Sequence, residues 1–114
     1  MGSASKLTRV QLKTGFAGTW SKSWISIDAS KEGRWLKYTE EIYNDSTVQI
    51  DLKKIKNLTL VKDVKNLAAP LGHNLPVLVL DCLDRSLYLQ SQAEKEALAL
   101  KDLIESVAFR YGLR

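Results

Sequence analysis

A chain of 114 residues with 45% hydrophobic, 26% charged and 8% aromatic residues has the composition of one globular domain, which excludes a disordered tail and a second core. Its apolar runs, such as 75–80, fall far short of the roughly 20 residues that a membrane-spanning helix requires, so we expect no transmembrane segment. A net charge of +4 suits weak contact with phosphates or an anionic membrane leaflet, but it is too small for a dedicated nucleic-acid-binding protein.

The two ends of the chain are expected to lie outside the domain. Residues 1–6 lack the apolar stretch of a signal peptide and are typical of a tag or linker, which leaves 7–110 for the domain and 111–114 for a tail. Cys82 is the single cysteine, so an intramolecular disulfide is excluded and a reducing compartment is favoured. We therefore expect a cytoplasmic protein that can lie at the periphery of membranes.

Seven segments in which apolar and polar residues alternate predict β-strands. In the second segment Ile25 and Ile27 share one face and Trp24 and Ser26 share the other. Turn-forming residues such as those at 31–33 separate the segments. The predicted strands are 7–14, 20–28, 34–38, 48–52, 55–64, 76–83 and 86–90.

The last segment of the chain changes to a helical period. Leu100, Ile104 and Val107 recur at a spacing of three and four, with charged residues largely elsewhere, which predicts an amphipathic helix. Ser91 and Glu94 fit a capping box, so the helix should begin near residue 92. Seven strands and a terminal helix favour a mainly β fold with one α-helix: a partly open antiparallel barrel of two packed sheets, capped by the helix.

Two stretches of the sequence resemble the pleckstrin-homology (PH) family. In 19–27 the spacing of the two tryptophans and two isoleucines resembles the second strand of that family, and in 79–91 an Asp-Arg turn followed by Tyr-Leu-Gln resembles its sixth and seventh strands. The resemblance spans about 7–109 and implies a PH-like superfold. The family usually has a tryptophan in the helix where this chain has Leu100, which can fill the same end of the barrel.

The resemblance also implies where a ligand site would lie. The family is best known for binding inositol phosphates at the open end of the barrel, through a lysine on the first strand and a basic-x-basic pair on the second. The corresponding positions here are Gln11, Ser21 and Ser23, none of which is basic. Losing three hydrogen bonds to charged groups, at ~1.5–3 kcal/mol each, would remove most stereospecific affinity. We therefore expect a vacated pocket with weak or no stereospecific phosphoinositide binding.

Basic side chains elsewhere are candidates for weak contact with an anionic membrane or an acidic partner. Phe16, at the tip of a predicted loop, could touch lipid, and the most basic window is 53–65. The same lysines are equally typical of side chains that keep an exposed sheet edge soluble and unpaired. The candidate residues are Lys13, Phe16, Lys22, Lys37, Lys53, Lys54 and Lys56.

Sequence motifs for catalysis or metal binding are missing. There is no glycine-rich phosphate loop and no Gly-x-Ser-x-Gly elbow, and neither His73 nor Cys82 has a second residue of its kind, so we expect no enzyme, no cofactor and no metal site. The chain is expected to be an adaptor or targeting module of a larger signalling or cytoskeletal regulator that docks a protein partner near membranes. Two alternatives remain: an anionic phospholipid-binding domain that uses a basic surface outside the family's site, and a peptide-binding domain of the phosphotyrosine-binding type.

Overall fold

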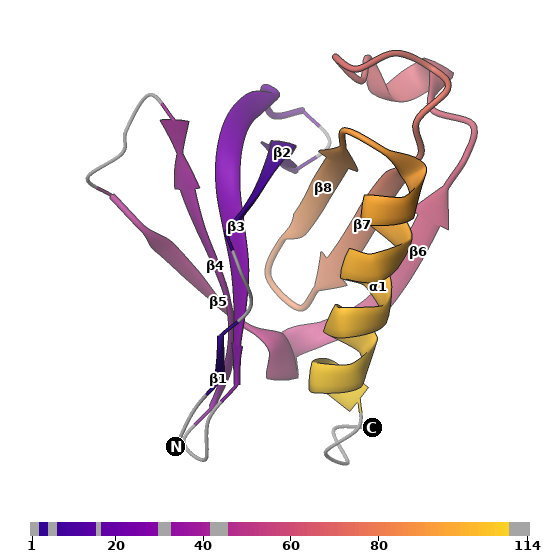
Figure 1. The fold of residues 1–114 in the computed structure, drawn as a ribbon. Helices are drawn as coiled ribbons and strands as arrows, with labels where there is room; N and C mark the ends of the chain where they lie inside the picture. Colours follow the sequence, from indigo (N-terminus) through magenta and orange to yellow (C-terminus); the bar gives the residue numbers. More distant parts are fainter. Residues whose placement is uncertain (1–2, 5–6, 16, 30–32, 42–45, 110–114) are drawn as a thin grey trace.

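The computed structural model describes residues 3–4, 7–15, 17–29, 33–41 and 46–109, and Figure 1 shows their arrangement as a curled sheet with one helix. No helix in these ranges combines the length and apolarity that a bilayer crossing needs. The elements are β1 (Ser3–Ala4), β2 (Thr8–Thr14), β3 (Ser21–Ala29), β4 (Arg34–Glu40), β5 (Val48–Asp51), the 3-10 helix η2 (Leu52–Lys54), β6 (Ile55–Val61), the 3-10 helix η3 (Lys65–Leu67), β7 (Val77–Cys82), β8 (Ser86–Ser91) and α1 (Glu94–Phe109).

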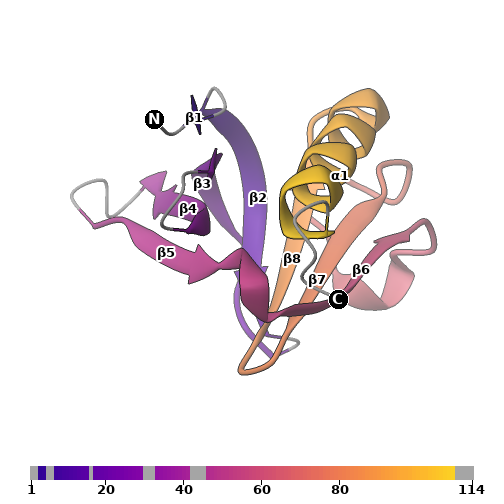
Figure 2. The ribbon, with the colours of Figure 1, turned by 90° about the horizontal axis from the view of Figure 1, so that it is seen from below.

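The strands pair in the order β5-β4-β3-β2-β8-β7-β6, and every pair is antiparallel. β2 pairs with β3 along one edge and with β8 along the other, so it joins the two halves of the sheet, as Figure 2 shows from below. The short β1 adds to β3, with Ser3 opposite Ala29, so residues 3–4 take part in the sheet although the sequence indicated a tag or linker. The mainly β fold with seven predicted strands and a C-terminal helix is confirmed.

The main core lies between the concave face of the sheet and α1. Ile25 and Ile27 of β3 are both almost fully buried, as their alternation predicted. From the helix, Leu100, Ile104 and Val107 pack into the same core. Full burial of one such side chain contributes about 1.5–3 kcal/mol, so the helical face expected from the spacing is what holds α1 against the sheet. Leu100 is buried at the position where the resemblance implies a tryptophan.

The helix begins at Glu94, two residues later than the capping box predicted. Ser91 is still part of β8, where it lies opposite Val10 of β2. The first helical hydrogen bonds run from the N–H groups of Glu96 and Ala97 to the carbonyl of Ala93. Pairing with a strand at the other end of the chain therefore outweighs the local capping signal.

A second, smaller apolar cluster lies on the outer face of β7 and β8. Val77 and Val79 point to this face because they alternate with the core residues Leu78 and Leu80. Segment 62–76, which connects β6 to β7, folds across them and supplies its own apolar side chains. The members of this cluster are Trp20, Val61, Val64, Leu67, Ala69, Val77, Val79 and Tyr88.

Hydrogen bonds from the sheet fasten segment 62–76 to that outer face. The fully buried Gln90 accepts from the N–H of Leu71 at 2.9 Å through Oε1. Its Nε2 donates to the carbonyls of Gly72 and Leu75, both at 3.0 Å. The indole N–H of Trp20 donates to the carbonyl of residue 67 at 2.8 Å. A stretch that the sequence predicted mainly as a loop is thus a packed layer of the fold.

Candidate functional site

The three positions of the expected phosphate site lie on neighbouring strands but face opposite sides of the sheet. β2 and β3 pair with Leu12 opposite Ser21 and with Gln11 opposite Lys22. Because directly opposite residues point to the same face, Ser21 and Ser23 lie on the core side and Gln11 lies on the outer side with Lys22. The two serines and Lys22 therefore lie on opposite sides of the sheet. Lys22 therefore cannot take over the position of either serine.

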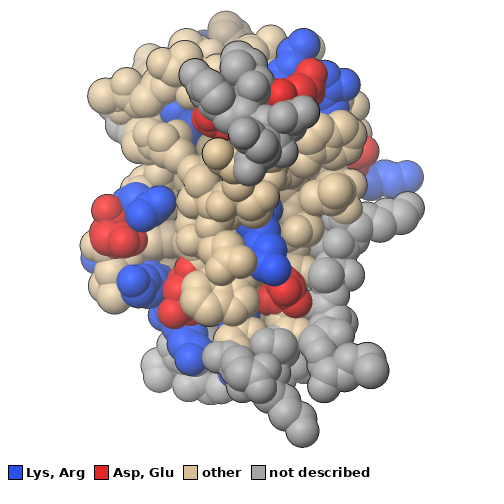
Figure 3. Space-filling model, turned by 90° about the vertical axis from the view of Figure 1, so that its left-hand side faces the viewer, with Lys and Arg blue, Asp and Glu red and all other residues tan. Residues whose placement is uncertain are grey.

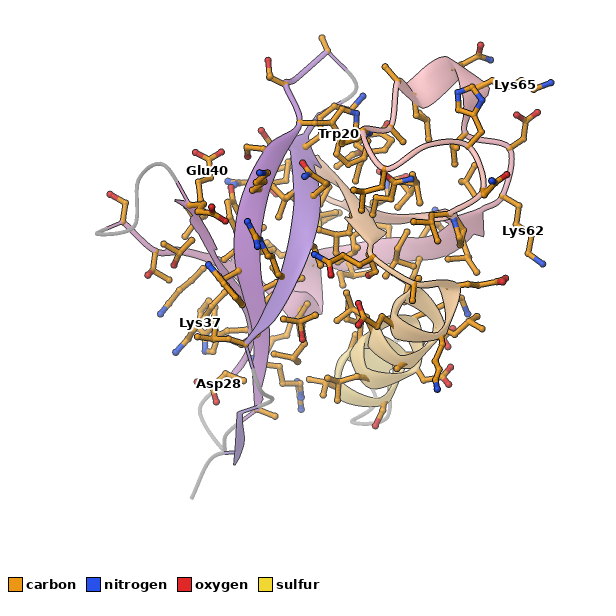
Figure 4. All side chains as sticks on the ribbon, turned by 45° about the horizontal axis from the view of Figure 1, so that its top comes forward. Trp20, Asp28, Lys37, Glu40, Lys62 and Lys65 are labelled. Atoms are coloured by element: carbon orange, nitrogen blue, oxygen red, sulfur yellow. The ribbon has the colours of Figure 1, made fainter. Side chains whose placement is uncertain are left out.

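A carboxylate occupies the core-side position next to these serines. Glu40 is the last residue of β4 and lies opposite Ser23 in the pairing of β3 with β4. Its Oε1 accepts a hydrogen bond from the hydroxyl of Ser21 at 3.0 Å, and Figure 4 shows it at the upper end of the sheet. The hydroxyl of the fully buried Ser23 donates to the backbone carbonyl of Ser21 at 3.4 Å. Both hydroxyls are thus engaged within the protein, and the charge beside them is negative.

A shallow hollow of about 270 Å³ opens at this end of the sheet, between β2, β4 and β5. Glu40 is the one charged residue among the described side chains that line it, together with Thr14, Tyr38, Ser46 and Val48. Burial raises the pKa of the Tyr38 phenol, an effect that Arg85 opposes and Glu40 reinforces. The phenol is therefore neutral at pH 7. Among the described residues of this hollow, a phosphate meets a carboxylate and neutral groups instead of the basic side chains that it requires.

Lys13 does not have the exposed position that membrane contact needs. The residue is only 4% exposed, and its Nζ lies 4.7 Å from the ring centre of Tyr88 and 5.5 Å from that of Trp20. An ammonium group over aromatic rings is held by the negative charge of their faces. The sequence interpretation of Lys13 as a lipid contact is therefore corrected: the rings of Trp20 and Tyr88 cover a position that strand alternation alone leaves open.

The remaining candidates are spread over several elements. Lys22 is exposed on β3, whereas the Nζ of Lys37 on β4 lies 3.0 Å from the Oδ2 of Asp28 in a cross-strand ion pair, visible in Figure 4. Figure 3 shows the side of the sheet on which these strands lie, where described side chains of both charges are scattered over an uncharged surface. Phe16 lies outside the described residues. The predicted candidates therefore do not form a single surface.

Five lysines gather instead around β6, and we call them the basic edge: Lys53, Lys54, Lys56, Lys62 and Lys65. All five are exposed, and none forms an ion pair with another described residue. Two nearby aspartates are engaged with the backbone: Asp51 accepts from the N–H of residue 53 at 2.9 Å, and Asp63 accepts from that of residue 65 at 3.4 Å. The basic edge thus keeps a local excess of positive charge. Figure 4 shows the side chains of Lys62 and Lys65 extending away from the fold.

Comparison with solved structures finds the same architecture in a known domain. The pleckstrin homology (PH) domain of USP37 aligns over 93% of this chain and 99% of its own, with a TM-score of 0.70 and 16% sequence identity. The chain has the PH fold. At this identity the similarity concerns the fold alone. Searches against family models and against curated proteins gave no match.

With the PH fold in view, Glu40 is the site residue that the sequence interpretation missed. Glu40 and Glu41 are adjacent acidic residues, but they differ in exposure and in partner: Glu40 is partly buried and bonded to Ser21, whereas Glu41 is exposed and paired with Arg9. Leu36 and Tyr38 are buried, and alternation along β4 places Glu40 on the same core side. This position could therefore have been predicted from the sequence. The hydrogen bond to Ser21 depends on strand register, which alternation does not provide. No three His, Cys, Asp or Glu side chains in the described part of the chain converge as a metal site would require.

Proposed function

We propose that this chain is a non-catalytic PH-type adaptor or targeting module that docks a protein partner near membranes and has weak or no stereospecific phosphoinositide affinity. In this proposal it works in the cytoplasm, as part of a larger signalling or cytoskeletal regulator. The observation that carries the proposal is the carboxylate of Glu40 at the open end of the sheet, hydrogen-bonded to Ser21 where the resemblance implies a basic side chain. A phosphate group carries about −1.5 to −2 charges at pH 7, so this carboxylate opposes its binding.

Exposed apolar and aromatic side chains support protein docking. Leu83, in the turn between β7 and β8, is 70% exposed, and Trp24 on the outer face of β3 is 39% exposed. The guanidinium of Arg9 lies 5.9 Å from the ring centre of Trp24 and forms an ion pair with Glu41 at 2.9 Å. Tryptophan and arginine are enriched where proteins bind one another, because both combine a large apolar area with a polar group.

Calorimetry with inositol phosphates tests this proposal. We expect the wild-type protein to give no saturable heat with D-inositol 1,4,5-trisphosphate, and the same result with the L-enantiomer. Glu40→Gln removes the repelling charge but adds no donor cation, so we expect at most a weak gain. Glu41→Gln is the matched control, since Glu41 is exposed and pairs with Arg9 on the outer face. Micromolar binding of the D-enantiomer alone by the wild-type protein would refute the proposal.

A second candidate function is binding of anionic phospholipid through the basic edge. It is favoured by five exposed lysines that form no ion pair in the described part of the chain. Near an anionic membrane each such lysine contributes about 1 kcal/mol, and salt screens the attraction. Co-sedimentation with vesicles of phosphatidylserine and phosphatidylcholine that weakens with salt and is lost in Lys53→Glu would support this function. Indifference to phosphatidylserine content would exclude it.

A further inference from the structure

A second hollow lies on the outer face of the sheet, on the side opposite to Glu40, and we call it the outer hollow. Alternation with the buried Val10 and Leu12 turns Arg9 and Gln11 of β2 to this face. The hollow encloses about 180 Å³, which is below the ~300–1,000 Å³ of small-molecule pockets and suits a single side chain. The described residues that line it are Arg9, Val10, Gln11, Lys22, Leu71 and Gln92.

Segment 62–76 forms one wall of the outer hollow, and the sheet holds that wall in place. The N–H of Leu71 donates to the side-chain oxygen of the fully buried Gln90 at 2.9 Å. Gln90 lies opposite Gln11 in the pairing of β8 with β2, and Gln11 lies opposite Lys22 of β3. One row of outer side chains therefore crosses three strands, and the outer hollow is bounded by this row and by the fastened segment.

The polar side chains of the outer hollow supply hydrogen-bond donors that are not used within the described part of the chain. There, the ammonium of Lys22 and the side-chain amides of Gln11 and Gln92 form no hydrogen bond or ion pair. Arg9 contacts Glu41 at 2.9 and 3.2 Å, and both contacts run through Nη2. A guanidinium has five N–H donors, so those on Nη1 and Nε are left for another acceptor.

The charge of the outer hollow matches one carboxylate. Arg9 and Lys22 contribute two positive charges and Glu41 offsets one of them, so one positive charge is left. A carboxylate carries one negative charge and accepts hydrogen bonds from guanidinium, ammonium and amide donors. A phosphate monoester carries about −1.5 to −2 charges at pH 7, which is more than the hollow balances. Charge and size together favour an acidic side chain over a phosphate group.

An exposed indole lies directly beside the outer hollow. Trp24 is opposite Arg9 in the pairing of β2 with β3, and the guanidinium lies 5.9 Å from its ring centre. Trp24 and Lys22 point to the same face of β3, two residues and therefore about 7 Å apart along the strand. An acidic and an apolar side chain at this separation in a partner can reach the hollow and the indole together.

We propose that the outer hollow binds a glutamate or aspartate side chain of a partner protein, and that an apolar residue two positions away in the partner packs on Trp24. Lys22 and Arg9 neutralise the carboxylate, and the amides of Gln11 and Gln92 complete its hydrogen bonds. The indole adds apolar area to the contact. The inference rests on the proposed docking function and names the surface and the partner chemistry for it.

NMR titration of the nitrogen-15-labelled protein with the capped peptide Gly-Ser-Phe-Ser-Glu-Ser-Gly tests the proposal. We expect saturable binding, seen as shifts of the backbone amides of Gln11, Lys22 and Leu71, that weakens as salt is added. The same peptide with glutamine in place of glutamate should bind at least tenfold more weakly. Equal binding of the two peptides, or binding of neither, would overturn the proposal.

Two variants at exposed positions separate the charge contact from the apolar contact. Lys22→Gln should reduce the preference for the glutamate peptide over the glutamine peptide at least threefold. Trp24→Thr should keep that preference and remove the advantage of phenylalanine over serine in the peptide. The matched control is Lys53→Gln, which makes the same charge change on η2 and should leave both preferences within twofold. An undiminished preference for glutamate in Lys22→Gln would place the carboxylate elsewhere and overturn the proposal.

Sodium acetate, inorganic phosphate and phosphatidylserine vesicles provide the competing outcomes. Phosphate that shifts the same three amides at a tenfold lower concentration than acetate would assign the outer hollow to phosphate groups and overturn the proposal. Vesicle binding that is lost in Lys22→Gln, with no difference between the two peptides, would assign it to a membrane and overturn the proposal as well.

The peptide and the inositol phosphates report on different faces of the sheet. Peptide binding depends on the outer hollow, whereas inositol-phosphate calorimetry reports on the hollow beside Glu40. Stereospecific inositol-phosphate binding together with glutamate-dependent peptide binding would refute the proposed function alone. Silent calorimetry with no peptide binding would refute only the role of the outer hollow.

Discussion

Replacing Gln90 with methionine measures how firmly segment 62–76 is fastened to the sheet. Methionine has nearly the same length and fills the same buried space, but it neither donates nor accepts the hydrogen bonds of the amide. Three bonds are lost: one from the N–H of Leu71 and two to the carbonyls of Gly72 and Leu75, all at 2.9–3.0 Å. The variant therefore changes hydrogen bonding while it preserves most of the packing.

The expected cost of Gln90→Met follows from these three bonds. Each is a neutral hydrogen bond with a net contribution of about 0.5–1.5 kcal/mol, so the free energy of unfolding should fall by about 3 kcal/mol. Gly72 is exposed, so water can hydrate its carbonyl, which keeps the cost below that of three fully buried unpaired groups. We also expect the apolar contacts of Val64 and Ala69 with the sheet to loosen.

Urea unfolding and native-state hydrogen exchange measure this effect. The wild-type and variant proteins are compared at the same pH and temperature, and exchange of the Leu71 amide reports local opening of the segment. Gln92→Met is the control, because Gln92 is exposed two positions along the chain and should change stability by less than about 0.5 kcal/mol. An equally small change in Gln90→Met, with unaltered exchange at Leu71, would refute the reasoning.

Three further outcomes are expected from the packing and charges described above. Ile104→Ala removes a fully buried side chain and should lower the free energy of unfolding by about 2–5 kcal/mol in urea titrations, whereas Leu98→Ala, at a 45% exposed position, should cost far less. Burial raises the pKa of Cys82 and Tyr38, so the folded state holds protons that the unfolded state releases. These two groups should therefore leave the free energy of unfolding unchanged below about pH 8 and lower it as the pH rises past ~8.5 to 10, and Cys82→Ala/Tyr38→Phe should flatten that fall. Arg9→Met breaks an exposed ion pair and should change the melting temperature little, because such pairs contribute only ~0–1 kcal/mol.

The positions of the strands, and the side of the sheet to which each side chain points, were predictable because they depend on neighbours in the sequence. The alternation of Ile25 and Ile27 with Trp24 defined the core side of β3, and helical spacing identified Ile104 and Leu100 as core residues. These are consequences of the periods of two and 3.6 residues, which hold wherever the strand or helix comes to lie. The fold class followed from their order along the chain.

Long-range contacts explain the features of the structure that the sequence patterns did not predict. Lys13 is buried because residues 20 and 88 bring aromatic rings over it, and these rings meet only after β2 has paired on both edges. The late start of α1 has the same origin, since Ser91 is held by its pairing with Val10. The charge at the vacated pocket required the register of β3 with β4, which sets Glu40 opposite Ser23. Each of these results depends on residues that are far apart in sequence.

The pairing of β2 with β8 also bears on the order in which the domain can form during synthesis. It joins segments about 80 residues apart, so closing this loop is slow compared with forming the local hairpins of β2 to β5. A nascent chain that has not yet produced β8 and α1 exposes one edge of β2 and the apolar face of the first half-sheet. Cooperative folding on the ribosome should therefore wait until the last strand and the helix have emerged.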